Sequence, residues 1–173
     1  MTVYRFDSAI ARTPADTVVH GLRAGGQPDP SLAGVRREHA AYVRALEDAG
    51  VAVQLLPPLP DFPDSIFVED PALVFRQGAI LLHPGAESRK GEAAHLAPAL
   101  RAAFADVLAL PEGHADGGDV LAMPDRVFIG LSARTDRAGA AALMGCLVQL
   151  GLRGEVAQTP AGTLHLKTAS SLV

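Results

Sequence analysis

Three segments of the chain place apolar residues every three or four positions, the spacing that puts them on one face of a helix. The first segment covers residues 31–49 and ends at Gly50, where a helix naturally stops. The second covers residues 90–104, and the third covers residues 136–150 and is followed by Gly151. We therefore expect three amphipathic helices, each with one face turned towards a core.

A short apolar run with strand character follows each expected helix, at residues 51–56, 107–110 and 154–157. A polar or Pro/Gly-rich loop comes next, and then a second strand-like run. These second runs cover residues 66–75, 118–123 and 164–173. The first two continue through a turn into a further strand, at residues 79–83 and 127–131, which predicts two β-hairpins.

These segments have a constant spacing. Asp70, Asp119 and Thr168 each begin or lie in a second strand-like run, and they are 49 residues apart. A period of about 50 residues indicates a repeat or a propeller-like arrangement. An ordinary α/β fold with coincident spacing is the alternative. The third unit stops after one expected hairpin arm, so we also expect the chain to be a fragment of a longer protein.

Composition narrows the class of protein. Of the 173 residues, 49% are hydrophobic and 20% are charged, and the formal net charge is −4, so the chain is a soluble globular type without a basic surface for nucleic acid. Mild acidity suits a cationic small substrate. The chain has one cysteine, no signal-peptide pattern and no long apolar run, so we expect a cytoplasmic protein that does not contact a membrane.

Carboxylates are concentrated between Phe62 and Asp70. Asp64, Glu69 and Asp70 fall within seven residues of an otherwise apolar stretch. If this stretch is a strand, alternation places Asp64 and Asp70 on the same side. Paired carboxylates there match the planar donors of a guanidinium group. The alternative is a solvated loop, because prolines flank the stretch on both sides.

Asp116 and His165 are two further candidate site residues. Asp116 precedes Gly117 and Gly118, which allow the backbone to approach a ligand closely, although a polar turn or a metal loop has the same pattern. His165 lies 49 residues after Asp116, so a repeat would bring the two together. A histidine that alternates with leucines on a strand is also typical of a structural, hydrogen-bonded residue.

Arg89 and Arg134 each follow an expected hairpin, where either could bind a substrate carboxylate or simply lie at the surface. Cys146 lies in the middle of the third expected helix, next to its apolar stripe. It has no cationic neighbour in the sequence, so we interpret it as a buried small hydrophobic residue and not as a nucleophile.

Taken together, these segments resemble the dimethylarginine dimethylaminohydrolases over essentially the whole chain. The matching motifs, in order, are Ile10-Ala-Arg12-Thr-Pro, Leu55-Leu-Pro-Pro, Phe62-Pro-Asp64-Ser-Ile-Phe-Val-Glu-Asp70, Pro84-Gly-Ala-Glu-Ser-Arg89-Lys-Gly-Glu, Gly117-Gly-Asp119, Ile129-Gly-Leu-Ser-Ala-Arg134-Thr and Leu164-His165-Leu-Lys-Thr168.

The resemblance implies a pentein-type α/β propeller, which is five-fold pseudosymmetric in the family. About three repeat units would be present here, in a single, incomplete domain. Their approximate limits are residues 1–83, 84–131 and 132–173. This expectation agrees with the 49-residue spacing.

The resemblance also implies a reaction. A cysteine thiolate attacks the guanidinium carbon of a methylated arginine, an alkylamine leaves from a covalent thiouronium intermediate, and water then releases citrulline. His165 matches the histidine that handles the protons, and Asp116 matches its acidic partner, usually a glutamate. The nucleophilic cysteine of the family lies beyond the end of this chain, so the chain alone is expected to be inactive.

The remaining matches concern the substrate. Asp64 and Asp70 match the carboxylates that hold the guanidinium, and we place Glu69 beside them. Arg89 and Arg134 match the pair that binds the amino acid's carboxylate. A last match, Leu22, corresponds to the tip of a lid.

No metal or organic cofactor is implied, and the expected partner is a small methylated arginine. Three alternatives stay open: an arginine deiminase or amidinotransferase, a non-catalytic module that binds arginine analogues or assists assembly, and a plain α/β domain. A homo-oligomer is a further hypothesis, because an incomplete propeller exposes strand edges.

Overall fold

The computed structural model describes residues 5–23, 25 and 28–172 of the chain. The chain divides into two compact units, an N-terminal unit (Tyr4–Val68) and a C-terminal unit (Glu69–Val173). None of the helices in the described part of the chain combines the length and apolarity that a bilayer crossing requires.

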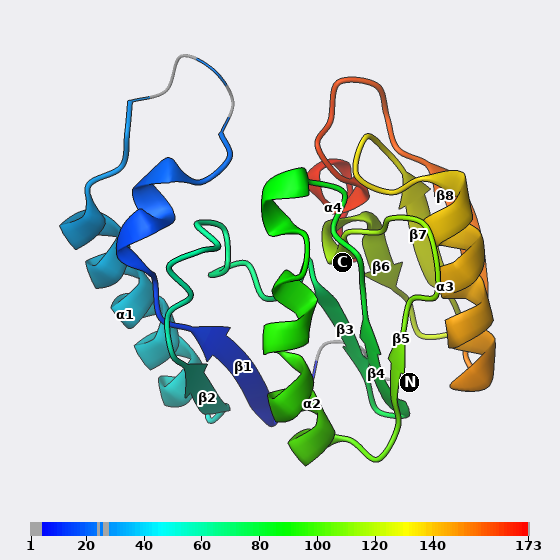
Figure 1. Ribbon diagram of the computed structural model, residues 1–173. Helices are drawn as coiled ribbons and strands as arrows, with labels where there is room; N and C mark the ends of the chain where they lie inside the picture. Colours follow the sequence, from blue (N-terminus) through cyan, green and yellow to red (C-terminus); the bar gives the residue numbers. More distant parts are fainter. Residues whose placement is uncertain (1–4, 24, 26–27, 173) are drawn as a thin grey trace. The chain divides into compact units, whose positions relative to one another are not determined.

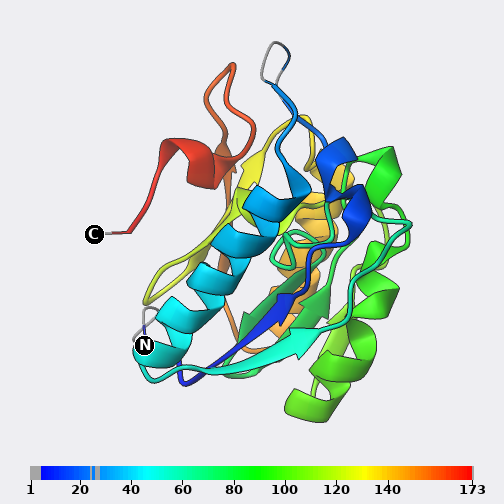
Figure 2. The same ribbon diagram turned by 90° about the vertical axis from the view of Figure 1, so that its left-hand side faces the viewer.

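The N-terminal unit is one parallel strand pair connected by a helix. Strand β1 (Ser8–Arg12) pairs with β2 (Ala52–Leu56), and α1 (Leu32–Asp48) connects them after a 3₁₀ turn at Asp16–His20. Figure 2 shows α1 lying along this strand pair. The predicted apolar face is confirmed, because the half-buried side chains of α1 include Leu32, Val35, His39, Val43 and Leu46.

Capping explains where α1 begins and ends. The Ser31 hydroxyl accepts a hydrogen bond from the Gly34 amide, which satisfies one of the free donors at the start of the helix. Gly50 follows the helix with a φ of 85°, a left-handed conformation that glycine adopts without strain. The predicted limits of this helix are therefore confirmed.

The C-terminal unit contains two three-stranded sheets with the same internal order. In each sheet an antiparallel hairpin is followed by a helix and then by a strand parallel to the second arm, as Figure 1 shows. The predicted hairpins are thus confirmed. The first sheet comprises β3 (Ala72–Phe75), β4 (Gly78–Leu81) and β5 (Val107–Ala109), and the second comprises β6 (Val120–Ala122), β7 (Val127–Leu131) and β8 (Gly154–Gln158).

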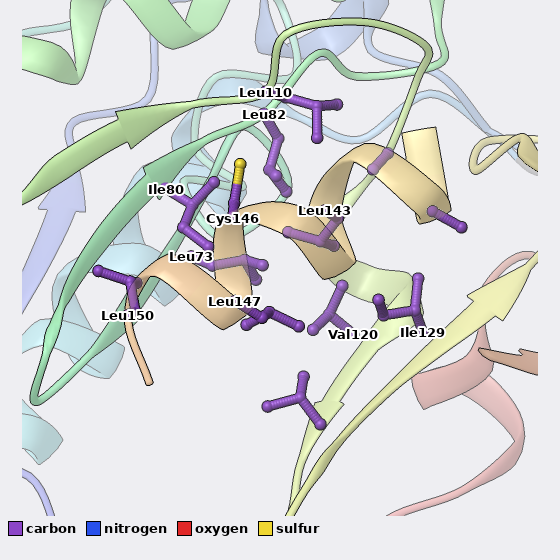
Figure 3. Close-up of a cluster of buried hydrophobic side chains, with 13 residues drawn as sticks. Leu73, Ile80, Leu82, Leu110, Val120, Ile129, Leu143, Cys146, Leu147 and Leu150 are labelled. Carbon is purple, nitrogen blue, oxygen red and sulfur yellow. The ribbon is translucent and has the colours of Figure 1, made fainter. Parts of the chain in front are cut away.

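Helix α3 (Arg137–Gln149) packs against β7 and β8, and its buried side supplies much of the core of this unit. Asp136 caps it by accepting a hydrogen bond from the Gly139 amide at 2.6 Å. Figure 3 shows the core of the unit, in which α3 meets side chains from both sheets. The core residues are Leu73, Ile80, Leu82, Leu110, Ala115, Val120, Val127, Ile129, Ala140, Leu143, Cys146, Leu147 and Leu150.

The interpretation of Cys146 as a buried hydrophobic residue is confirmed. Its side chain lies in the core among Ile80, Leu82 and Leu143, and the residue is 3% exposed. Burial raises the pKa of the Cys146 thiol, because the apolar surroundings disfavour the thiolate. The thiol is therefore far from the reactive form that a nucleophile needs.

The expected helix over residues 90–104 is shorter than predicted. It is replaced by a 3₁₀ turn at Glu92–His95 and by α2 (Ala97–Ala103), after an earlier 3₁₀ turn at Glu87–Arg89. Gly91 adopts a φ of 87°, which interrupts any continuous helix at the start. Pro98 lies in the first turn of α2, where its missing N–H costs nothing.

Strand alternation is the wrong description of residues 62–70. The strand begins only at Ala72, and the preceding residues form consecutive turns in which Ser65 and Phe67 donate backbone hydrogen bonds to Phe62 and Asp64. Pro63 and Pro71 disfavour a continuous strand here. The predicted second strand at residues 118–123 likewise begins with a 3₁₀ turn at Gly117–Asp119 and becomes β6 only at Val120.

The predicted strand at residues 164–173 is also wrong, because this segment forms the short helix α4 (Leu166–Ala169). The His165 amide donates to the Thr168 hydroxyl at 3.3 Å, and the Thr168 amide donates to the His165 carbonyl at 3.1 Å. The Leu166 amide is bound by the Asp119 carboxylate at 2.9 Å. These local bonds favour a helical turn over an extended strand, so His165 does not alternate with leucines on a sheet.

Truncation of the core side of α3 should destabilise the protein much more than truncation of its exposed side. Leu143 is fully buried in the core, so Leu143→Ala should lower the free energy of unfolding by about 3 kcal/mol. Val148, on the same helix, is 70% exposed, so Val148→Ala is the matched control and should change little. Urea unfolding measures both, and equal effects would contradict this core assignment.

Candidate active site

Asp116 is a buried carboxylate with one oxygen engaged and one oxygen free. The residue is 0% exposed, and it precedes the 3₁₀ turn at Gly117–Asp119. Its Oδ1 accepts a hydrogen bond from the Gly85 amide at 2.7 Å. Within the described part of the chain, no donor makes a hydrogen bond to Oδ2. Burial raises the pKa of Asp116, since the ionised carboxylate loses its hydration.

His165 faces Asp116 across this free oxygen. The distance from His165 Nε2 to Asp116 Oδ2 is 3.9 Å, and the imidazole is 13% exposed. The ring packs against Gly118, where a Cβ atom would come within 2.7 Å of the ring carbons Cγ and Cδ2. Only glycine leaves room for the imidazole at this position. The expected meeting of Asp116 and His165 is therefore present in the structure.

Asp119 is the second carboxylate at the histidine, and the sequence analysis did not assign it to the site. Its Oδ2 is 3.4 Å from His165 Nδ1 and accepts hydrogen bonds from the Ser132 and Thr135 hydroxyls at 2.6 and 2.7 Å. Burial alone would raise the pKa of Asp119, but the nearby His165 imidazole and hydrogen bonds from Ser132 and Thr135 outweigh it and lower the pKa, even though His165 Nδ1 makes no hydrogen bond within the described part of the chain. Asp119 therefore stays ionised. The constant spacing from Asp70 was the signal that could have identified it.

Asp70 belongs to a buried charge cluster with Arg89 and Glu92. Arg89 is 3% exposed and binds Glu92 through Nε and Nη2, both at 2.7 Å, while its Nη1 binds Asp70 Oδ2. Burial alone would lower the pKa of Arg89, but Glu92 and Asp70 outweigh burial and raise it. The other oxygen of Asp70 accepts from the Gly118 amide at 3.2 Å. Glu92, which the sequence analysis also missed, holds Arg89, and Arg89 holds Asp70.

Arg134 completes the cationic groups around Asp116. Its Nη1 lies 3.9 Å from Asp116 Oδ2, and its side chain is 21% exposed. This arginine is less enclosed than Arg89, so a ligand anion could reach it more easily. The predicted carboxylate-binding role of the two arginines stays a prediction.

The other predicted residues lie elsewhere in their units. Glu69 is 65% exposed and pairs with Lys167 at 3.1 Å, at the surface of the C-terminal unit. Asp64 and Leu22 belong to the N-terminal unit, where Asp64 Oδ1 accepts a hydrogen bond from the Leu22 amide at 2.9 Å. Asp64 therefore holds the backbone next to Gly21, while the Leu22 side chain is 51% exposed. Their predicted roles in substrate binding stay predictions.

The arrangement suits a cation that carries hydrogen-bond donors. One ligand atom each from Asp70, Asp116 and His165 lie within 4.8 Å of one another. Such a group of carboxylate and imidazole atoms could hold a metal ion or the N–H groups of a guanidinium. The free oxygen of Asp116 and the imidazole beside it can also accept and release a proton, as general acid–base chemistry requires.

Comparisons with known proteins single out one family. The family model described as "N,N dimethylarginine dimethylhydrolase, eukaryotic" matches residues 25–149. The N(G),N(G)-dimethylarginine dimethylaminohydrolase of Pseudomonas aeruginosa is 40% identical over 165 residues, which cover 94% of this chain and 65% of that protein. The enzyme of the same name from Streptomyces coelicolor is 37% identical over 163 residues, 93% of this chain and 63% of that protein. The chain thus spans just under two thirds of these relatives.

Solved structures give the same picture. A cysteine-to-serine mutant of the Pseudomonas aeruginosa enzyme in complex with citrulline matches 95% of this chain and 65% of its own, with a TM-score of 0.91 and 40% identity. The N-terminal domain of ArgZ, an arginine dihydrolase from cyanobacteria, matches 88% of this chain and 58% of its own, with a TM-score of 0.76. At 16% identity, the second match shows a shared fold alone.

Replacing Asp116 by asparagine should stabilise the protein at neutral pH. The pKa of Asp116 is raised in the folded state, so the protonated carboxyl stabilises the fold fully when the pH is below the ordinary pKa of 3.8. This stabilisation is lost as the pH rises through the folded-state pKa. The amide of the asparagine would keep an acceptor for the Gly85 N–H without the buried charge. We expect Asp116→Asn to increase the free energy of unfolding by about 1–2 kcal/mol at pH 7, and this gain should narrow in acid.

The exposed Asp125 is the matched control for this measurement. The hydrogen bond from Arg126 lowers the pKa of Asp125, so the ionised carboxylate stabilises the fold when the pH is above the ordinary pKa. This stabilisation is lost as the pH falls through the folded-state pKa. Asp125→Asn should therefore change the pH dependence with the opposite sign. Denaturant unfolding between about pH 3 and 8 measures both, and destabilisation by Asp116→Asn at neutral pH would contradict the unsatisfied state of Oδ2.

Breaking the cluster at Glu92 should be costly, because it leaves the buried Arg89 half paired. Glu92→Gln should lower the free energy of unfolding by about 3 kcal/mol. Glu87 and Lys90 form an ion pair with the same three-residue spacing, but both side chains are exposed, so Glu87→Gln should change stability little. Chemical denaturation compares the two, and similar losses would show that the buried cluster is not holding this region.

Proposed function

The chain belongs to the dimethylarginine dimethylaminohydrolase family, and we propose that it provides most of an active site that hydrolyses dimethylarginine to citrulline and an alkylamine. The observation that carries this proposal is the free oxygen of Asp116, which is buried beside Asp70 and His165. A buried acceptor without a hydrogen bond is costly unless a ligand donor meets it, and Arg134 and His165 are both 3.9 Å from this oxygen, too far to supply one. The N–H groups of a guanidinium are such donors, and their positive charge compensates the carboxylates.

The proposed chemistry assigns a role to each group. Asp70 and Asp116 hold the guanidinium so that its central carbon is open to a thiolate. When the thiolate attacks, a tetrahedral adduct forms, and His165 gives a proton to the departing alkylamine. The resulting thiouronium is then attacked by water, His165 takes a proton from this water, and expulsion of the thiolate leaves citrulline.

The nucleophile is proposed to come from residues other than Cys146. This thiol is buried in the core and its pKa is raised, so it neither reaches a substrate nor ionises easily. Citrulline is bound in the related structure that carries a cysteine-to-serine mutation, which supports a cysteine nucleophile in the family. A region that corresponds to the remaining third of the relatives would supply it.

The other substrate contacts are proposals of the same kind. Arg134, together with Arg89, would bind the substrate's carboxylate, and Glu69 would contribute to substrate binding. The guanidinium-binding role of Asp64 and the lid role of Leu22 are retained as predictions from the resemblance. Because Arg89 is already bound by Glu92 and Asp70, Arg134 has the greater freedom to turn towards a ligand. The substrate would thus be held at both ends, with the guanidinium at the carboxylates.

We also propose the finer architecture. The identical order of the two sheets in the C-terminal unit supports a repeated unit, and the similarity to family structures supports its place in a pentein-type propeller within a single domain. The repeat limits at residues 1–83, 84–131 and 132–173 belong to this proposal. A cytoplasmic location and assembly into a homo-oligomer are retained as predictions from the sequence.

We expect the 173-residue chain to bind the substrate without converting it. The 173-residue chain should bind dimethylarginine in calorimetry without releasing citrulline, whereas a form extended by the downstream coding sequence should release it. Asp116→Asn should weaken binding about ten-fold or more, because it replaces a charged acceptor with a neutral one. The control Asp125→Asn should bind normally.

Two results would contradict the proposal. Failure of both forms to bind dimethylarginine would remove the substrate assignment, and arginine bound and converted instead would move a deiminase ahead. Tight binding without turnover by the extended form would favour a non-catalytic module.

A further inference from the structure

Glu92 occupies one whole edge of the Arg89 guanidinium. Its Oε2 accepts a hydrogen bond from Nε and its Oε1 accepts one from Nη2, both at 2.7 Å. Glu92 is 2% exposed and Arg89 is 3% exposed, so water screens this pair very little. Two parallel bonds of this kind make the strongest arginine–carboxylate pairs. Arg89 is therefore bound more completely by Glu92 than by Asp70, which accepts a bond from Nη1.

The backbone between the two residues brings Glu92 back to this edge. Arg89 ends one 3₁₀ turn, which begins at Glu87, and Glu92 begins the next, which ends at His95. Gly91 lies between these turns with a φ of 87°, a left-handed conformation that glycine adopts without strain. Both partners are consequently fixed by short hydrogen-bonded turns, and the pair does not depend on flexible segments.

Asp70 keeps acceptor capacity for a ligand. Its Oδ2 accepts from Arg89 Nη1 and its Oδ1 accepts from the Gly118 amide, and these are its side-chain hydrogen bonds within the described part of the chain. A carboxylate offers about four acceptor positions, so about two remain. One oxygen of Asp70 lies within 4.8 Å of ligand atoms of Asp116 and His165. The remaining capacity is therefore located where the guanidinium is proposed to bind.

Without Glu92, Arg89 would compete with the ligand for Asp70. A guanidinium and a carboxylate pair most stably through two parallel hydrogen bonds. Arg89 already meets Asp70 through Nη1, so turning the released Nη2 towards Asp70 would complete such a pair. A guanidinium from outside would then find fewer acceptor positions on Asp70 and less uncompensated negative charge.

We propose that Glu92 is a positioning residue, which keeps Arg89 from forming a two-bond pair with Asp70 and so reserves Asp70 for the cationic end of the ligand. This role rests on the proposed function, in which Asp70 holds the guanidinium, and it needs no contact between Glu92 and the ligand. Arg89 carries one positive charge against two carboxylates, so the cluster retains negative charge that attracts a cation.

The pKa of Arg89 supports the same order of partners. Burial alone would lower this pKa, but the hydrogen bonds and charge of Glu92 raise it, followed by the charge and hydrogen bond of Asp70. Arg89 therefore stays charged, with Glu92 as its principal partner. Removal of the charge of Glu92 should shift Arg89 towards Asp70.

The test compares a cationic ligand with a neutral one that has the same amino-acid end. Dimethylarginine carries a guanidinium, whereas citrulline carries an uncharged urea group. In calorimetry on the 173-residue chain, Glu92→Gln should weaken binding of dimethylarginine about ten-fold and leave binding of citrulline nearly unchanged. Lost contacts at the amino-acid end, or general damage to the fold, would weaken both ligands equally.

A matched control and a kinetic readout accompany this comparison. Glu87→Gln changes an exposed glutamate that pairs with Lys90 at the same three-residue spacing, and it should alter binding of neither ligand. In the extended form, Glu92→Gln should raise KM for dimethylarginine with little change in kcat, because it removes binding that the ground state and transition state share. Inhibition by citrulline should stay as in the unaltered form.

A double variant keeps the proposal testable if Glu92→Gln does not fold. Arg89→Met together with Glu92→Gln removes both members of the buried pair, so neither is left as an unpaired charge. No arginine then competes for Asp70, and the preference for dimethylarginine over citrulline should rise above that of the unaltered chain. If Glu92 acts in folding alone, this preference should not change.

The proposal is overturned if Glu92→Gln weakens both ligands equally or weakens neither. It is also overturned if the double variant fails to raise the preference for the cation. Failure of the unaltered chain to bind dimethylarginine, with failure of the extended form to convert it, would instead remove the proposed function, and the role of Glu92 would fall with it.

Discussion

Burial of negative charge is the constraint on which the C-terminal unit depends. Asp116, Asp119 and Glu92 are almost fully buried, and Asp70 lies close to them. A buried carboxylate is costly unless cations or hydrogen-bond donors compensate it. Three of these four carboxylates are compensated by partners. Glu92 and Asp70 both bind Arg89, and Asp119 accepts hydrogen bonds from hydroxyls and a backbone amide.

Asp116 is the one of these four carboxylates that is incompletely compensated. Asp116 keeps an oxygen without a hydrogen bond within the described part of the chain, although the protein has supplied such bonds to the carboxylates around it. Ala115 and Val120, which adjoin Asp116 and Asp119 in the sequence, belong to the apolar core formed by both sheets and α3. This open oxygen distinguishes Asp116 from the carboxylates of the ion pairs around it, and it is the basis of the proposed binding site.

Much of the fold could be predicted from sequence periodicity. Both α1 and α3 have regular apolar spacing, a capping residue and a following glycine, so their limits were predicted to within one residue. The failures occurred where local hydrogen bonds compete with periodicity. The prolines around Asp64 favour turns, Gly91 breaks the second helix, and the amide of Leu166 is captured by Asp119 from far along the chain.

The sequence predicted some residues of the candidate site and missed others. The 49-residue spacing correctly brought Asp116 to His165, and the same spacing made Asp119 the counterpart of Asp70, although no site role was predicted for Asp119. Glu92 could be suspected only from its position three residues after Arg89. Neither the free oxygen of Asp116 nor the division of the two imidazole nitrogens between two carboxylates can be derived from a sequence pattern, because both depend on distances set by tertiary packing.

The most direct test of the central claim is a structure of the protein with dimethylarginine bound. The account predicts that a guanidinium N–H lies within hydrogen-bond distance of Asp116 Oδ2, with Asp70 and His165 Nε2 around the same group. A ligand bound away from Asp116, or an Asp116 carboxylate that instead closes onto Arg134 while the ligand is bound, would contradict it.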